Sequence, residues 1–280
     1  MLLVYLKALN KNKLFRKVYG SIKSMKGVIF LLFFLNLLFA SPALALVKAN
    51  ILLVAPKNKM VPIMVYHSVV SLDGHENAMQ KHYKVDPVVF ESEMKFLKNN
   101  GYTTITFSKL AEHIATGAVI PDKSVVITFD DGIQNQYENA FPILKKYGDV
   151  ATFFVYTKVI HPVNKNFMSW AEVLDLDKAG MEIGSHSISH AMLTTLSAVK
   201  LTEEVSGSKK ILEERLGKKV NTLAYPSYMQ NDQTRIAVQQ AGYFAARAGW
   251  KKAQNSKSEI YDLGSIEATN NLKAFEANFK

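Results

Sequence analysis

The chain has 280 residues and no cysteine, and 48% of its residues are hydrophobic, so it can bury a sizeable core but cannot form disulfides or thiolate metal sites. Its formal charge of +10 overstates its basic character, because seven of the 34 basic residues precede residue 46 in a stretch without acidic residues. The rest of the chain contains 27 basic and 24 acidic residues. This net charge of +3 excludes nucleic acid as an expected partner.

The N-terminal segment, residues 1–45, is typical of a secretion signal. A basic region is followed by the apolar run GVIFLLFFLNLLFA and by SPALA, which ends in a small-x-small cleavage pattern. Because the sequence from Met25 onward is a complete signal peptide by itself, we expect the true start of the chain at Met25. An uncleaved anchor is the alternative, since no charge lies between Lys26 and Lys48. In either case we expect residues 46–280 to be exported, to the periplasm or cell surface.

From residue 46 onward, short β-branched or aromatic runs alternate with stretches of helical period. In chain order the pattern predicts a strand at 63–66, a helix from Asp86 to Gly101, a strand at 124–129, a helix after Gln134, a strand at 151–156, a helix after Ser169, a strand at 181–184, a helix that ends at Gly217, a strand at 221–225, a helix after Gln230 and a strand at 243–247. This alternation implies a parallel sheet, and without a linker or repeat the 46–280 region reads as one α/β domain. A barrel of β/α units fits its length better than an open sheet does.

The chemically capable residues come directly after predicted strands. The C-terminal ends of parallel strands meet at one edge of a sheet, so these positions are expected to converge on one pocket. They are His67, Asp130, Asp131, His186, Tyr225 and Pro226.

Two adjacent carboxylates and a glycine end the apolar run VVITFDDG. In a regular strand Asp130 and Asp131 would point to opposite faces of the sheet. Gly132 permits backbone angles that end the strand sharply, which would turn both carboxylates towards one opening. Taken alone, an Asp-Asp-Gly sequence is more often a turn than a site.

The stretch HSISH places His186 and His190 four residues apart. This spacing would put both imidazoles on one side of a helical turn, where they can share a metal, although exposed helix histidines are also common. Two histidines and a carboxylate suit Zn²⁺ or another divalent transition metal, with positions left for water.

Taken together, these motifs resemble the NodB-like polysaccharide deacetylases of carbohydrate esterase family 4. TFDDG at 128–132 resembles the first family motif, SHSISH ending at His190 the second, and AYPSY at 224–228 the third, and the likeness extends over 61–275. The resemblance implies a distorted (β/α) barrel with metal-dependent esterase chemistry. PIMVYHS and LAYP are most similar to exported deacetylases of poly-β-1,6-N-acetylglucosamine and related exopolysaccharides.

The resemblance also implies which residues bind the metal and act as the base. Asp131, His186 and His190 match the metal ligands of the family, and Asp130 matches its catalytic base. The expected metal is Zn²⁺, with Co²⁺ or Ni²⁺ as alternatives. An unligated carboxylate beside the metal can accept a proton as the water nucleophile forms.

The oxyanion donor, the substrate contacts and the general acid are assigned to residues outside the first two motifs. By resemblance, the backbone N–H of Ser227 would hold the oxyanion, and Tyr225 and Pro226 would contact the substrate. A general acid must protonate the leaving nitrogen, but no histidine follows His190. His67 is therefore the candidate acid, since the exopolysaccharide subgroup has a histidine at this position; the alternative is a histidine that only packs at the strand end.

Two stretches depart from the family pattern. In AYPSYM, Tyr228 is displaced by one position and the loop glycine is missing. Near the C-terminus, Ser265 stands where an arginine is common, which leaves the orientation of the base unexplained. Arg247 could supply the charge instead, although a charged residue after a strand is usually solvated.

The sequence thus predicts an exported, metal-dependent N-deacetylase of an N-acetylhexosamine polymer. Peptidoglycan or chitin oligomers are alternative substrates. A catalytically inactive carbohydrate-binding homologue is the alternative class, favoured by the altered third motif and by Ser265. The N-terminal segment could associate the protein with a membrane, and polymer-export proteins could be partners.

Overall fold

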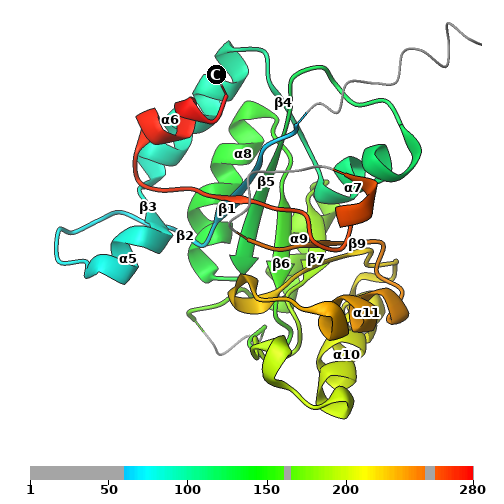
Figure 1. Ribbon diagram of the computed structural model, residues 1–280. Coiled ribbons are helices and arrows are strands. Elements are labelled where there is room, and N and C mark those ends of the chain that lie inside the picture. Colours follow the sequence, from blue (N-terminus) through cyan, green and yellow to red (C-terminus); the bar gives the residue numbers. More distant parts are fainter. Residues whose placement is uncertain (1–59, 161–164, 250–255, 280) are drawn as a thin grey trace, which may run out of the picture. The chain divides into compact units, whose positions relative to one another are not determined.

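A computed structural model describes residues 60–160, 165–249 and 256–279; the expected signal or anchor lies outside these residues. Eight strands form one sheet in the order β10-β1-β5-β6-β7-β8-β9, with β4 also paired to β5, and every pair is parallel (Figure 1). The strands are β1 (Ile63–Tyr66), β4 (Thr103–Ile105), β5 (Ser124–Asp131), β6 (Thr152–Val155), β7 (Glu182–Ser185), β8 (Thr222–Ala224), β9 (Ala245–Arg247) and β10 (Ile266–Glu267).

The chain after β9 connects the two edges of this sheet. Leu263 forms a parallel bridge with Arg247, and three residues later the chain enters β10, which pairs with β1. The sheet therefore curls into a distorted barrel, as predicted. Each predicted strand is present with shifts of one or two residues, except that β5 continues through both aspartates instead of ending before them.

Helices surround the curled sheet, and all but α7 pack on its outer face (Figure 1). They are α6 (Pro87–Asn99), α7 (Phe107–Thr116), α8 (Phe141–Tyr147), α9 (Trp170–Lys178), α10 (Ala198–Leu216), α11 (Asp232–Gln240) and α12 (Leu272–Ala277), and α8 follows a π-helical turn at Gln136–Ala140. Between β1 and α6 lie a small pair of strands and a short helix: β2 (Ser68–Val69), α5 (Ala78–Tyr83) and β3 (Lys84–Val85).

The helix boundaries confirm the sequence signals that predicted them. The Asp86 side chain accepts a hydrogen bond from the Val88 N–H at 2.9 Å, and Pro87 occupies the first position of α6. Helix α10 ends at Gly217, whose φ of 67° is the left-handed conformation of a helix C-cap.

Apolar side chains fill both faces of the sheet. The cluster inside the barrel includes Ile63, Val126 and Phe154, and α7 adds Phe107 and Leu110 to it. The larger cluster lies between the sheet and the other helices. In the described part of the chain, no helix is both long and apolar enough to cross a membrane.

One buried carboxyl group lies in the larger cluster, outside the row of strand-end residues. Glu93 of α6 is fully buried, and the Tyr66 hydroxyl donates a hydrogen bond to its Oε2 at 2.8 Å. Burial raises the pKa of Glu93 to about 8. Folding is therefore coupled to keeping this group protonated.

We expect Glu93→Gln to make the folded protein less sensitive to alkali. Because the pKa of Glu93 is higher in the folded than in the unfolded chain, its contribution is intact below pH 4.5 and is lost as the pH rises towards 8. At pH 7 the variant should be more stable than wild type by about 3 kcal/mol, and by much less at pH 5. Urea unfolding at both pH values measures this.

The control is Glu91→Gln on the same helix, where the carboxylate is only half-buried and pairs with Lys146 at the surface. Its effect should be small and similar at both pH values, because a surface ion pair contributes little to stability. A Glu93→Gln protein whose stability runs parallel to that of wild type across this range would show that Glu93 is ionised in the fold.

Candidate active site

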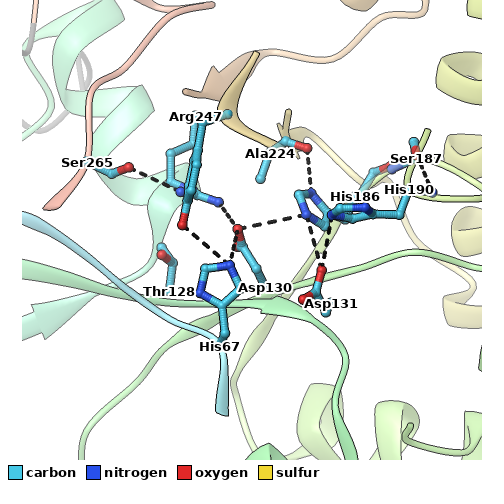
Figure 2. Close-up of polar contacts among 12 residues, drawn as sticks. His67, Thr128, Asp130, Asp131, His186, Ser187, His190, Ala224, Arg247 and Ser265 are labelled. Atoms are coloured by element: carbon cyan, nitrogen blue, oxygen red, sulfur yellow. Dashed lines mark hydrogen bonds and ion pairs between the residues drawn. The ribbon is translucent and has the colours of Figure 1, made fainter. Parts of the chain in front are cut away.

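Four of the six strand-end residues converge as predicted, and Arg247 joins them. His67 follows β1, Asp130 and Asp131 end β5, His186 follows β7 and Arg247 ends β9 (Figure 2). Asp130 Oδ2 lies 4.0 Å from His67 Nε2 and 3.8 Å from His186 Nε2. One carboxylate therefore connects side chains from widely separated parts of the sequence.

The end of β5 turns both aspartates to the same side. Asp131 has a φ of 75° and Gly132 a φ of 74°, so two successive residues are left-handed. A Cβ on Gly132 would lie 3.1 Å from Val155 Cγ1, so glycine also fits the space there. The predicted sharp turn exists, but it begins at Asp131, whose side chain makes this conformation costly.

Asp131, His186 and His190 form a group that fits a divalent metal. Asp131 Oδ1 lies 3.5 Å from His186 Nε2 and 3.3 Å from His190 Nε2, and the three ligand atoms all lie within 4.8 Å of one another. This Oδ1 is buried and has no hydrogen-bond partner among the described residues. His186 Nδ1 is 2.7 Å from the Ala224 carbonyl oxygen, which it can reach only as a donor, so Nε2 of the neutral ring presents its lone pair to the group.

The prediction that the two histidines lie on a helical turn is wrong. Residues 186–190 form a loop in which Ser187 has a φ of 68° and His190 a φ of 60°. The His190 N–H donates to Ser187 Oγ at 3.1 Å, which closes the loop on itself. The ring centroids of His186 and His190 are 4.8 Å apart, so the loop produces the proximity expected of a helix.

Asp130 has one paired and one unpaired oxygen. Its Oδ2 forms an ion pair with Arg247, while Oδ1 is buried without a hydrogen-bond partner in the described part of the chain. Burial alone would raise the pKa of Asp130, but the charge of Arg247, aided by His186 and His67, holds it below its usual value. Asp130 is thus an ionised carboxylate with one oxygen available to accept a proton.

Arg247 is fully buried, contrary to the expectation that a charged residue after a strand is solvated. Its guanidinium lies between the rings of Phe154 and Tyr228, with 5.4 Å to each ring centroid. Nη1 donates to Ser265 Oγ at 3.1 Å. Ser265, which stands where the family commonly has an arginine, thus accepts a hydrogen bond from Arg247 of β9 (Figure 2).

His67 is held by an acidic residue of β10. Its Nδ1 lies 3.0 Å from Glu267 Oε1, and its Nε2 lies 3.4 Å from the Tyr228 hydroxyl, which also bonds to Glu267. Burial lowers the pKa of His67, but the hydrogen bond to Glu267 and the charges of Asp130, Glu267 and Asp131 outweigh it, so the pKa lies above its usual value.

The altered third motif brings Tyr228 into this site. Ser227 and Tyr228 both have left-handed backbones, with φ values of 55° and 61°. A Cβ on Gly249 would lie 2.5 Å from Tyr228 Cγ, so the glycine leaves the space that the ring occupies. Strained backbone of this kind persists where surrounding contacts fix it, and it is frequent at functional sites.

The residues expected to contact substrate differ in accessibility. The Tyr225 side chain is fully buried, and its hydroxyl donates to the Tyr261 carbonyl at 3.0 Å, so it belongs to the core. Pro226 is buried as well. Ser227 is exposed beside them, which leaves the backbone of this turn as the accessible part.

Sequence reasoning missed several residues near the site. Gln136 is buried in the π-helical turn and donates to the backbone carbonyls of both His67, at 2.6 Å, and Asp130. Half-buried tyrosines flank the row of polar side chains: the ring of Tyr83 lies 4.6 Å from that of His67, and the ring of Tyr156 lies 5.4 Å from that of His190.

The barrel, the group that fits a divalent metal and the adjacent carboxylate are the features of a hydrolase. The sequence model of the polysaccharide deacetylase family matches residues 118–246. The poly-β-1,6-N-acetyl-D-glucosamine N-deacetylase of Staphylococcus aureus (strain MSSA476) is 30% identical over 200 residues, covering 66% of this chain and 68% of that protein. The chain therefore belongs to the polysaccharide deacetylase family, whose members are hydrolases that act on carbon–nitrogen bonds.

Further relatives agree with this assignment. YxkH of Bacillus subtilis (strain 168) is 32% identical over 187 residues, 67% of this chain but only 63% of YxkH. A polysaccharide deacetylase structure from Bacillus cereus has a TM-score of 0.67 at 27% identity, covering 79% of this chain and 69% of that one. The Streptococcus pyogenes deacetylase PplD shares the fold, with a TM-score of 0.72 at 24% identity over 79% of this chain and 98% of its own.

Proposed function

We propose that this chain is a metal-dependent N-deacetylase of an N-acetylhexosamine polysaccharide, with poly-β-1,6-N-acetylglucosamine or a related exopolysaccharide as the first candidate substrate. The observation that carries the proposal is the free Oδ1 of Asp130 beside the group of Asp131, His186 and His190. A proton acceptor next to a metal-binding group is what hydrolysis of an amide requires. The name of the Staphylococcus relative supports this polymer.

Asp131, His186 and His190 would hold the metal, with Zn²⁺ as the first candidate and Co²⁺ or Ni²⁺ as alternatives. One carboxylate and two imidazoles are ligands that these ions share, and such a set leaves positions open. When bound, the metal supplies a Lewis acid that polarises the acetyl carbonyl and makes water more acidic.

The flanking residues then complete the hydrolysis. Asp130 Oδ1 accepts a proton from the attacking water, while Arg247 holds the other oxygen and keeps the group ionised. The water oxygen joins the acetyl carbon and the carbon–nitrogen bond breaks. His67 donates a proton to the leaving nitrogen, so the products are acetate and a free amine.

The rim of the site suits a sugar chain. The backbone N–H of Ser227 would donate to the oxyanion that forms on the acetyl group. Tyr83 and Tyr156 lie next to His67 and His190, at the two ends of the polar row, and are only half-buried. Aromatic side chains offer apolar faces with a polar tip, which favours a ligand with both apolar and hydroxyl surfaces.

The site of action is a further proposal. The sequence of residues 1–45 supports export to the periplasm or cell surface, with membrane association if the segment is retained. A polymer substrate outside the cytoplasm would place the protein beside polymer-export proteins, which are candidate partners.

Acetate release tests the function directly. The purified protein should release acetate from poly-β-1,6-N-acetylglucosamine, lose this activity with a chelator and regain it with Zn²⁺ or Co²⁺. Chitin oligomers and peptidoglycan, assayed in parallel, rank the alternative substrates. If the metal-loaded protein binds saccharide but releases no acetate from any polymer, it is a carbohydrate-binding homologue and the proposal is wrong.

The proton-donor role of His67 predicts a change in pH dependence for Glu267→Gln. Removing the acidic partner removes causes that raise the pKa of His67, so burial lowers it and the donor form disappears at lower pH. The alkaline limb of kcat/KM should therefore move to lower pH. Glu276→Gln, at a half-buried position of α12, is the control, and an unchanged alkaline limb in Glu267→Gln would contradict the role.

A further inference from the structure

The loop that carries the two proposed histidine ligands has a backbone conformation that its own residues disfavour. Ser187 and His190 are both left-handed, with φ values of 68° and 60°, although neither is a glycine. Left-handed backbone is unfavourable for a residue with a side chain, so a loop with two such residues persists only where its surroundings fix it. The contacts that fix it therefore bear on the spacing of His186 and His190.

Glu204 of α10 makes the largest set of these contacts. Its Oε2 accepts hydrogen bonds from the backbone N–H groups of Ile188 and Ser189, each at 2.9 Å. Its Oε1 accepts a hydrogen bond from Ser189 Oγ at 2.5 Å. These donors lie between the two histidines, and hydrogen bonds to an ionised acceptor are stronger than neutral ones.

The same face of α10 makes one further contact with this loop and one with the strand that leads into it. Gly207 and Ser208 follow Glu204 by three and four residues, which places all three side by side on the helix. A Cβ on Gly207 would lie 2.7 Å from Ile188 Cδ1, so the glycine makes room for that side chain. Ser208 Oγ accepts a hydrogen bond at 2.8 Å from Ser185, the residue before His186.

We propose that Glu204 is a positioning residue that fixes the loop between the metal-binding histidines in its ligating shape. Glu204 is not a member of the Asp131, His186 and His190 group, so it acts on the metal only through the loop. The inference rests on the proposed function, because it takes this group as the metal site. It assigns the helix face of Glu204, Gly207 and Ser208 to the support of metal binding.

The test compares Glu204→Gln and Glu204→Ala with the neighbouring variant Glu203→Gln. Glu203 is exposed and pairs with Lys200 on the helix surface, so its replacement changes the charge of α10 without touching the loop. Two quantities are measured on the full chain: the Kd for Zn²⁺ in competition with a chelator, and amide hydrogen exchange at Ile188 and Ser189 in the metal-free protein.

We expect Glu204→Ala to weaken Zn²⁺ binding by about 10- to 100-fold and to speed exchange at both amides. Glu204→Gln keeps the shape and one acceptor but not the charge, so it should lie between Glu204→Ala and wild type, and it remains informative if Glu204→Ala folds poorly. Glu203→Gln should match wild type in both measurements.

Wild-type Zn²⁺ affinity in both Glu204 variants would overturn the proposal, and so would unchanged exchange at Ile188 and Ser189. Failure to bind Zn²⁺ in the wild-type protein would overturn it as well. Metal affinity is measured separately from acetate release. A wild-type protein that binds Zn²⁺ but releases no acetate would therefore refute the deacetylase function, while the affinity comparison still decides the role of Glu204.

Discussion

Replacing Asp130 with Asn should lower acetate release by about 10²- to 10⁴-fold, the usual contribution of general base catalysis. Asparagine keeps the size of the side chain, but its amide cannot accept the proton that Oδ1 would take from water. The three proposed metal ligands, Asp131, His186 and His190, are unchanged, so the variant should bind as much Zn²⁺ as wild type. Acetate assays and metal analysis on the same preparation measure both effects.

The matched comparison is Asp131→Asn. That variant should lose Zn²⁺ as well as activity, because Asp131 Oδ1 is shared between His186 and His190. If Asp130→Asn instead keeps its metal and retains turnover within tenfold of wild type, Asp130 is not the base. If Asp130→Asn loses its metal, the carboxylate is part of the metal site and the roles of the two aspartates must be revised.

The fold and most of the site could be predicted because their signals are local. Alternating apolar runs locate the strands, and Asp86 with Pro87 marks the start of α6. The chemically capable side chains directly follow apolar runs, and the ends of parallel strands share one edge of the sheet. The positions of Asp130, Asp131, His67 and His186 therefore follow from sequence patterns of a few residues.

The parts that could not be predicted depend on contacts distant in sequence. Arg247 follows a short apolar run, like many solvated residues, and only the pairing order of the sheet places it against Asp130, 117 residues away. The loop at His186 has helical spacing but no helix, because Glu204 and left-handed backbone determine its shape. Gln136 shows no distinguishing signal, since a π-helical turn is not visible in hydrophobic periodicity.

Arg247→Met should have the largest effect on stability, because it leaves Asp130 buried without its partner. Removing one member of a buried ion pair typically costs about 3–5 kcal/mol. It also removes the main cause that lowers the pKa of Asp130, so burial raises that pKa. Asp130, the proposed base, is then ionised only at higher pH, and the acid limb of kcat/KM should move to higher pH.

The pH dependence of the loss in stability shows whether Arg247 stabilises the fold through its charge or through its packing. In wild type the pKa of Asp130 is lowered, so the stability it contributes is present above the unfolded value of 3.8 and is lost as the pH falls through the folded value. In Arg247→Met the pKa of Asp130 in the folded protein is raised, so this variant loses stability as the pH rises above the unfolded value of 3.8. The difference between the two proteins in urea unfolding should therefore be larger at pH 8 than at pH 5.

Two further variants complete the test. Arg247→Lys keeps a positive charge but not the planar group that reaches both Asp130 and Ser265, so it should be less damaging than methionine. In the double variant Arg247→Met with Asp130→Asn, no buried charge is left unpaired, so its stability should exceed that of Arg247→Met alone. If the double variant is instead less stable by the sum of the single effects, Arg247 stabilises the barrel through its packing between Phe154 and Tyr228, and its charge does not sustain the base.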